Sequence, residues 1–161
     1  MNVEPIRKRL RVPIEPTDAF RLFTVDMGSW WPYATHSRAE EEQTVAQVVF
    51  EEGAGGRIYE IMTDGTEGYW GTVTAWEPPY RVVFDWRPND RVGQPYTEVD
   101  VTFMPGDDGG TVVELEHRGW ERLGEQAEEA RKEYAADTGW GLVFDQAFAR
   151  AAGGSDAPAR R

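Results

Sequence analysis

Apolar positions near the C-terminus repeat with the period of an α-helix. Between residues 138 and 152 they fall at i, i+3, i+4, i+7 and i+8, which form one broad stripe on a helix of 3.6 residues per turn. The residues of this stripe are Trp140, Val143, Phe144, Ala147 and Phe148. Thr138 stands where its hydroxyl could cap the first turn, and Gly153 ends the pattern. So large an apolar stripe needs a sheet or another broad surface to cover it.

Most of the chain between residues 44 and 117 shows the period of two that is typical of half-buried β-strands. The clearest case places Val99, Val101 and Phe103 on one face and polar residues, Glu98, Asp100 and Thr102, on the other. The predicted strands are residues 6–12, 44–50, 57–62, 69–76, 81–86, 96–104 and 111–117. Because short turns rich in glycine and proline join most of them, we expect consecutive strands to pair antiparallel.

Two shorter helical patterns follow the first strand. Residues 17–23 place Ala19, Phe20 and Phe23 on one face of a predicted helix. Residues 29–32, Ser-Trp-Trp-Pro, contain two adjacent aromatic side chains, and we expect them in a second short helix or a loop.

The order of these elements predicts the fold class. A strand, short helices, six strands and a long helix give an α+β domain, in which an antiparallel sheet has its helices on one face. Residues 121–137 are charged and helical in propensity, and they lead into the terminal helix. We expect a single domain over residues 1–152 and a disordered tail over residues 153–161.

The charge of the chain excludes several kinds of partner. Its 161 residues carry 29 acidic and 17 basic side chains, which gives a net charge of −12. A protein that binds nucleic acid through the phosphate backbone needs a basic face, and so does one that docks on an anionic membrane. We therefore expect neither nucleic acid nor a membrane as partner.

The absence of cysteine and of long apolar runs limits both the kinds of site and the expected location of the protein. With no cysteine the chain can form neither a disulfide nor a thiolate metal site. The first residues, MNVEPIRKRLRV, contain no apolar run long enough for a signal peptide, and no later run approaches a membrane span. A cytoplasmic location is the expectation that follows.

Several short motifs occur in a characteristic order along the chain. They are Phe20–Phe23, Trp30–Pro32, Gly55–Arg57, Gly71–Pro78, Val83–Trp86, Gly110–Thr111, Glu116–Trp120 and Gly139–Trp140. Together they resemble the START-like (SRPBCC) helix-grip superfamily of polyketide cyclases and birch-pollen allergens, over residues 5–152. Within it the chain is most similar to the bacterial branch that resembles the C-terminal domain of heat-shock ATPase activators.

The resemblance implies a curved sheet of about seven antiparallel strands wrapped around the C-terminal helix, with a cavity between them. Members of this superfamily bind small molecules, cyclise polyketides or assist a chaperone. The fold therefore does not by itself give the function, which has to be argued from the site.

Tryptophans are the first candidates for a ligand site. Trp70 and Trp86 lie on predicted strands and Trp140 on the C-terminal helix, so all three could line a cavity between sheet and helix. Each one alone could equally fill the core, but of the set we expect at least one to border the cavity. The predicted ligand-binding residues are Tyr59, Trp70, Trp86, His117, Tyr134, Trp140 and Phe144.

His117 is the one weak candidate for catalysis. It follows Val113 and Leu115 at steps of two along a strand, so it is expected to face inward with them. An inward histidine at a cavity mouth could act as a general acid or base. It could equally be a neutral imidazole hydrogen-bonded to a backbone carbonyl, and we favour this structural role.

Charged residues within the strands give weaker signals. Glu60 and Asp85 alternate with inward candidates and are expected to face solvent; a carboxyl that faced the cavity beside His117 would make acid–base chemistry credible. Arg57 or Arg87 could pair with an acidic ligand group.

Metal, phosphate and nucleophile sites find little support. His36 and Glu40 have the spacing of one helical turn, but a single such pair does not make a metal site. The glycines of residues 53–56 precede a strand, whereas a phosphate-binding loop precedes a helix. No Gly-x-Ser-x-Gly motif is present. We expect neither a metal nor a cofactor.

Three hypotheses remain. The first is a binding module for a small, largely apolar or aromatic molecule, held between the sheet and the C-terminal helix. The second is a chaperone-assisting or partner-binding domain, which would need an exposed apolar patch on the convex face of the sheet or around Trp30 and Trp31. The third is an enzyme of the polyketide cyclase or aromatase type that uses His117.

Overall fold

In a computed structural model, which describes residues 3–32, 44–86 and 96–153, seven strands form one antiparallel sheet around the C-terminal helical segment. The strand order across the sheet is β1-β7-β6-β5-β4-β3-β2. The strands are β1 (Ile6–Val12), β2 (Val45–Phe50), β3 (Arg57–Met62), β4 (Glu67–Glu77), β5 (Arg81–Trp86), β6 (Thr97–Pro105) and β7 (Thr111–Arg118). The predicted α+β class and antiparallel pairing are confirmed.

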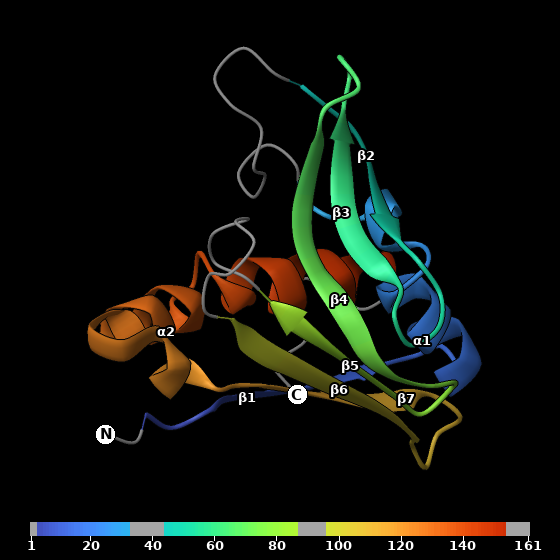
Figure 1. The fold of residues 1–161 in the computed structure, drawn as a ribbon. Coiled ribbons are helices and arrows are strands. Elements are labelled where there is room, and N and C mark those ends of the chain that lie inside the picture. Colours follow the sequence, from blue (N-terminus) through green and yellow to red (C-terminus); the bar gives the residue numbers. More distant parts are fainter. Residues whose placement is uncertain (1–2, 33–43, 87–95, 154–161) are drawn as a thin grey trace.

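The sheet bends sharply, so that one of its faces becomes concave. Figure 1 shows β2, β3 and β4 rising steeply from the layer formed by the other strands, with the C-terminal helical segment running along the inside of the bend. The helix α1 (Pro16–Phe23) lies at one end of this arrangement and α2 (Ala127–Ala135) at the other. The helix-grip expectation is therefore met.

Alternation of apolar and polar residues decides which face of each strand is buried. In β6, Val99, Val101 and Phe103 are completely buried on the inner face. Across the pairing of β6 with β7, Val99 stands opposite His117 and Phe103 opposite Val113. The inner face of this part of the sheet is thus continuous, as the period of two predicts.

The outer face of the same strands carries ion pairs. Arg118 on β7 pairs with Glu98 at 2.9 Å and with Asp100 at 3.0 Å, and Arg81 on β5 reaches Asp100 at 2.9 Å. Partial burial alone would raise the pKa of Asp100, but the hydrogen bonds from Arg81 and Arg118 outweigh it and hold the pKa below its ordinary value. These charges make the convex face polar.

The short helical elements lie where the sequence places them. The helix α1 buries Ala19, Phe20 and Phe23, as predicted, and a 3₁₀ turn η1 (Met27–Ser29) precedes Trp30. A second 3₁₀ segment, η2 (Trp120–Gln126), leads from the last strand into α2.

The C-terminal helical segment differs from the regular α-helix that the sequence predicts. It is a π-helix, η3 (Gly141–Phe148), followed by the short α-helix α3 (Ala149–Ala151). The N–H of Ala149 reaches the C=O of Phe144, five residues back. Trp140 takes the N-cap position of η3, so the predicted capping role of Thr138 is wrong.

The wider turns also change which residues face the sheet. Hydrogen bonds in a π-helix span five residues, so each turn takes more residues than a turn of α-helix. Buried positions are therefore spaced further apart in the sequence. Phe144, Phe148 and Ala149 are completely buried, whereas Ala147 is only half-buried. The prediction that Ala147 anchors the core is therefore wrong, and Ala149 takes that place. The tail expected from residue 153 falls almost wholly outside the described residues.

Candidate functional site

Three indole rings from three separate elements meet on the inner side of the sheet. Trp31 follows η1, Trp70 lies on β4 and Trp86 ends β5. Their ring centroids are 4.6 Å apart for Trp31 and Trp70, 5.4 Å for Trp70 and Trp86, and 6.2 Å for Trp31 and Trp86. We call these three residues the tryptophan cluster. Trp31 retains 7% exposure and Trp86 8%, so the cluster borders on solvent rather than lying at the centre of the core.

A chain of hydrogen bonds runs beside the tryptophan cluster through His117. The indole nitrogen of Trp140 donates to Nδ1 of His117 at 2.9 Å. Since an indole N–H can only donate, Nδ1 must be the unprotonated nitrogen and the hydrogen of the neutral ring sits on Nε2. Nε2 then donates to Thr97 Oγ1 at 2.7 Å, and Thr97 donates to the carbonyl oxygen of Trp86 at 3.0 Å. We call this series of hydrogen bonds the His117 chain. It links η3, β7, β6 and β5.

Burial sets the charge of His117. The side chain has no exposure, and burial lowers its pKa from 6.5 to about 3. The prediction that His117 faces inward is confirmed, but both ring nitrogens are engaged inside the protein. A proton could be exchanged only by breaking one of these two bonds, which favours the structural role over acid–base catalysis.

Tyr134 joins the tryptophan cluster to the His117 chain. The indole nitrogen of Trp86 donates to the Tyr134 hydroxyl at 3.0 Å. The Tyr134 ring also packs edge-on to His117 at 5.1 Å and lies 5.4 Å from Trp120. Trp70, Trp86, His117, Tyr134 and Trp140 are thus brought together.

Phe144 and Tyr59 lie apart from this group. Phe144 is completely buried and stacks on Phe148, with centroids 5.8 Å apart. Tyr59 is half-buried on the outer face of β3, where the Arg57 guanidinium lies 4.3 Å above its ring. Arg57 also pairs with Glu51 and Glu67, two side chains of the protein itself.

Two acidic residues expected at the surface are buried. Glu60 has no exposure and Asp85 has 8%, so the expectation that they face solvent is wrong. In β3 the inward residues are Ile58, Glu60 and Met62, whereas Tyr59 faces outward, so the predicted phase of this strand was shifted by one residue. In the sheet, β4, β5 and β6 lie between the strands that carry Glu60 and His117.

Asp85 is on the outer face but is covered by a bulge in the neighbouring strand. Its Oδ1 accepts a hydrogen bond from the backbone N–H of Thr72 at 3.0 Å. A Cβ atom at Gly71 would lie 1.9 Å from the carbonyl oxygen of Asp85. The glycine is therefore required for β4 and β5 to approach this closely.

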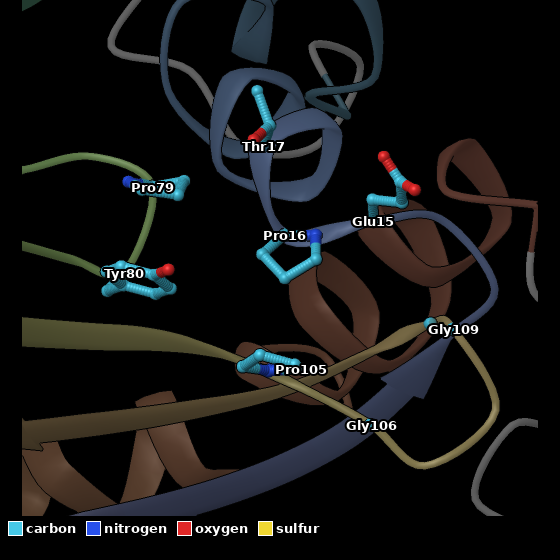
Figure 2. A pocket seen from close by; sticks show the side chains of 9 residues that line it. Glu15, Pro16, Thr17, Pro79, Tyr80, Pro105, Gly106 and Gly109 are labelled. Atoms are coloured by element: carbon cyan, nitrogen blue, oxygen red, sulfur yellow. The ribbon is translucent and has the colours of Figure 1, made fainter.

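A surface pocket of about 320 Å³ lies at the opposite end of the sheet from α2. Figure 2 shows Pro79 and Tyr80 facing Pro16 at the start of α1, with Pro105 and Gly106 beside them. Tyr80 is 52% exposed. None of the predicted ligand-binding residues lines this pocket.

Among the described residues, no cluster of histidine, aspartate and glutamate could hold a metal ion, and no helix has the length and apolarity to cross a membrane. Arg87, His36 and Glu40, which were weighed as candidates, lie outside the described residues.

Sequence reasoning missed the role of Trp31. It stands outside any periodic segment, so no pattern assigns its side chain to a face of the sheet. The signal that could have found it is the Trp-Trp-Pro sequence, because an aromatic pair in a turn needs an apolar surface to cover it.

Comparisons with known proteins agree with this architecture. Residues 14–152 match the model of the family described as Activator of Hsp90 ATPase homolog 1-like protein. No curated protein matches the chain. Among solved structures, an anthrahydroquino-gamma-pyrone synthase, Txn09, is 32% identical over 92% of this chain and 97% of its own, with a TM-score of 0.61.

Two further solved structures are similar to the chain at lower identity. CalC from Micromonospora echinospora, described as a self-sacrificing resistance protein, is 23% identical over 94% of this chain and 97% of its own, with a TM-score of 0.64. An Hsp90 activator from Plasmodium falciparum is 19% identical over 72% of this chain and 73% of its own, with a TM-score of 0.49.

Proposed function

The chain belongs to the Activator of Hsp90 ATPase homolog 1-like family, and from this premise we propose that it binds a small, largely apolar aromatic molecule between its sheet and its C-terminal helical segment. In this proposal the ligand lies against the tryptophan cluster, with Tyr134 at its border. Trp140 and His117 hold the surrounding elements in place.

The observation that carries the proposal is the convergence of Trp31, Trp70 and Trp86. Indole rings supply large, flat apolar surfaces, and aromatic pairs at such distances gain about 0.5–1.5 kcal/mol beyond burial alone. Three of them from distant parts of the chain, two retaining some exposure, form a surface on which a flat ring system can stack. The polar groups beside it, such as the Tyr134 hydroxyl, would orient the ligand.

The relative that is 32% identical to the chain supports the aromatic nature of the ligand. It is described as an anthrahydroquino-gamma-pyrone synthase complexed with a compound abbreviated SUM. The name denotes a fused aromatic ring system. We infer a ligand of that general kind, flat and of several rings, for the present chain.

Quenching of tryptophan fluorescence tests the proposal. We use 2,6-dimethoxyanthraquinone as a flat apolar probe and compare wild type with Trp70→Leu and the control Trp76→Leu. Trp76 lies on the same strand but packs against Phe20 at 5.0 Å, away from the cluster. Loss of a stacking partner worth about 1 kcal/mol predicts roughly fivefold weaker binding for Trp70→Leu and unchanged binding for the control. Equal affinities in all three proteins would contradict the site.

An enzyme of the cyclase type is the second candidate, because the same relative is described as a synthase. His117 is a poor catalyst in this arrangement, since it is buried and bonded at both nitrogens. If turnover of an aromatic polyketide is found and is abolished in His117→Ala while the variant still folds and binds the probe, His117 regains the catalytic role.

A chaperone-assisting role draws support only from the family's description. The apolar patch that this hypothesis requires around Trp30 and Trp31 is absent from the described surface, because Trp31 is buried and Trp30 packs on Phe23 and Phe148. Charged ion pairs occupy the convex face.

A further inference from the structure

A carboxyl group is buried in the inner face of β3. Glu60 has no exposure and points to the same side as Ile58 and Met62, which are also buried. The predicted ligand-binding residues do not include it, and it is not part of the hydrogen bonds that run through His117. A carboxyl among apolar side chains is costly to bury, so its position calls for a physical reason.

The two cross-strand neighbours of Glu60 are small or apolar. Its partner on β4 is Gly68, which has no side chain, and its partner on β2 is Val48, which is buried and apolar. The next inward-facing side chain along β4 is Trp70, two residues from Gly68. Residues diagonal to one another across two strands are close enough for long side chains to touch a common object. The carboxyl therefore borders the tryptophan cluster.

We propose that Glu60 is a specificity-determining residue of this site, and that it selects flat aromatic ligands carrying a hydroxyl group. The inference rests on the proposed ligand-binding function. The two oxygens of a carboxyl accept about four hydrogen bonds in total, so Glu60 can accept one from a ligand in addition to the interactions it makes within the protein.

The chemistry of the carboxyl narrows the ligand class further. A phenolic or hydroquinone hydroxyl can donate a hydrogen bond to the Glu60 carboxyl, and this bond is short and charge-assisted where the carboxyl is ionised. A ligand carboxylate would instead bring a negative charge into a buried position beside an acid, in a protein of net charge −12. The expected ligand is thus a neutral polycyclic phenol or hydroquinone, and not an aromatic acid.

Two matched probes test this inference. The first is 2,6-dihydroxyanthraquinone, measured at a pH at which its hydroxyls are protonated, and the second is 2,6-dimethoxyanthraquinone, which has the same rings but no donor. Wild type is expected to bind the dihydroxy probe roughly tenfold more tightly, the value of one charge-assisted hydrogen bond. In Glu60→Gln the preference is expected to fall to about threefold, and in Glu60→Met it is expected to disappear. The control is Asp85→Asn, which alters a buried acid on the outer face and should keep the wild-type preference.

The outcomes separate this inference from the function on which it rests. If wild type and both Glu60 variants bind the two probes with the same ratio, the role of Glu60 is contradicted while aromatic binding stands. If wild type binds neither probe, the proposed function falls and the role of Glu60 falls with it. If one Glu60 variant fails to fold, as judged by circular dichroism, the other variant decides the question. If wild type binds the dimethoxy probe more tightly than the dihydroxy probe, the inference is contradicted without any variant.

Discussion

Trp140 fixes the tautomer of His117, because an indole nitrogen can donate a hydrogen bond but cannot accept one. Burial keeps the imidazole neutral, and its hydrogen therefore sits on Nε2, which donates to Thr97. His117, a weak candidate for catalysis in the sequence, thus links β7 to the C-terminal helical segment. The tautomer follows from the donors and acceptors around the ring and from nothing in the local sequence.

Lowering the pH should destabilise the fold through His117. Its pKa is about 3 in the folded protein and 6.5 as the ordinary value, so between these values the unfolded chain binds a proton that the folded protein does not. Stability from this group is complete above pH 6.5 and is lost as the pH falls toward 3, at up to about 1.4 kcal/mol per pH unit. Urea unfolding at a series of pH values measures the slope, and a His117→Asn variant should show a smaller one.

Nitrogen-15 shifts of the His117 ring give a check that needs no variant. We expect a neutral ring protonated at Nε2 throughout the range in which the protein stays folded. A ring that becomes doubly protonated near pH 6.5 without unfolding would contradict the assignment of burial as the controlling effect.

Gly71 allows β4 and β5 to approach closely, because it has no side chain. A Cβ atom there would meet the carbonyl oxygen of Asp85 at 1.9 Å, a backbone atom that cannot move aside. We expect Gly71→Ala to lower the free energy of unfolding by about 1–3 kcal/mol or more. The matched control is Gly106→Ala, whose new Cβ would lie 3.3 Å from Asp108 Oδ1 and 3.6 Å from the carbonyl oxygen of Gly110. Equal stability of the two variants in urea unfolding would show that β4 and β5 can separate here.

At the scale of single elements, the strands were the easiest part to predict. The clean alternation in β6 and β7 fixes the inner face, including the inward position of His117. In β3 the same reasoning gave the wrong phase, because Tyr59 and Ile61 are as apolar as Ile58 and Met62 and both faces of the strand look buried. This wrong phase placed Glu60 on the solvent-facing side of the strand.

The C-terminal helical segment was predicted in place but not in its hydrogen bonding. A period of 3.6 assigned Ala147 to the core, whereas the π-helical turns bury Ala149. Spacing in a sequence cannot distinguish the two, since alanine fits either position. The Thr138 cap failed for the same reason, because the start of the segment depends on how its first turn is bonded.

Two alanine substitutions decide between these registers. Ala149→Leu is expected to destabilise the protein by about 1–3 kcal/mol, because Ala149 is completely buried, while Ala147→Leu should cost less. Thermal unfolding of both variants gives the order. If Ala147→Leu is the more damaging change, the regular α-helical register is correct and the π-helical one is contradicted.

For the whole molecule, the bend of the sheet brings together residues that the sequence keeps apart. Trp31, Trp70 and Trp86 come from three separate elements, and their rings lie 4.6–6.2 Å apart. Sequence patterns and resemblance predicted the fold class and the antiparallel pairing of strands, and they selected four tryptophan or tyrosine residues that do lie together. They could not give Trp31 or the position of Glu60, both of which depend on packing between distant segments.

The central claim is that an aromatic molecule binds against the tryptophan cluster, and intermolecular nuclear Overhauser effects test it most directly. With 2,6-dimethoxyanthraquinone bound, we predict contacts from the probe's ring protons to the indole protons of Trp70 and Trp86. The surface pocket at Tyr80 provides the internal comparison, because it is lined by none of these residues. Contacts to Tyr80 and none to the tryptophan cluster would contradict the account.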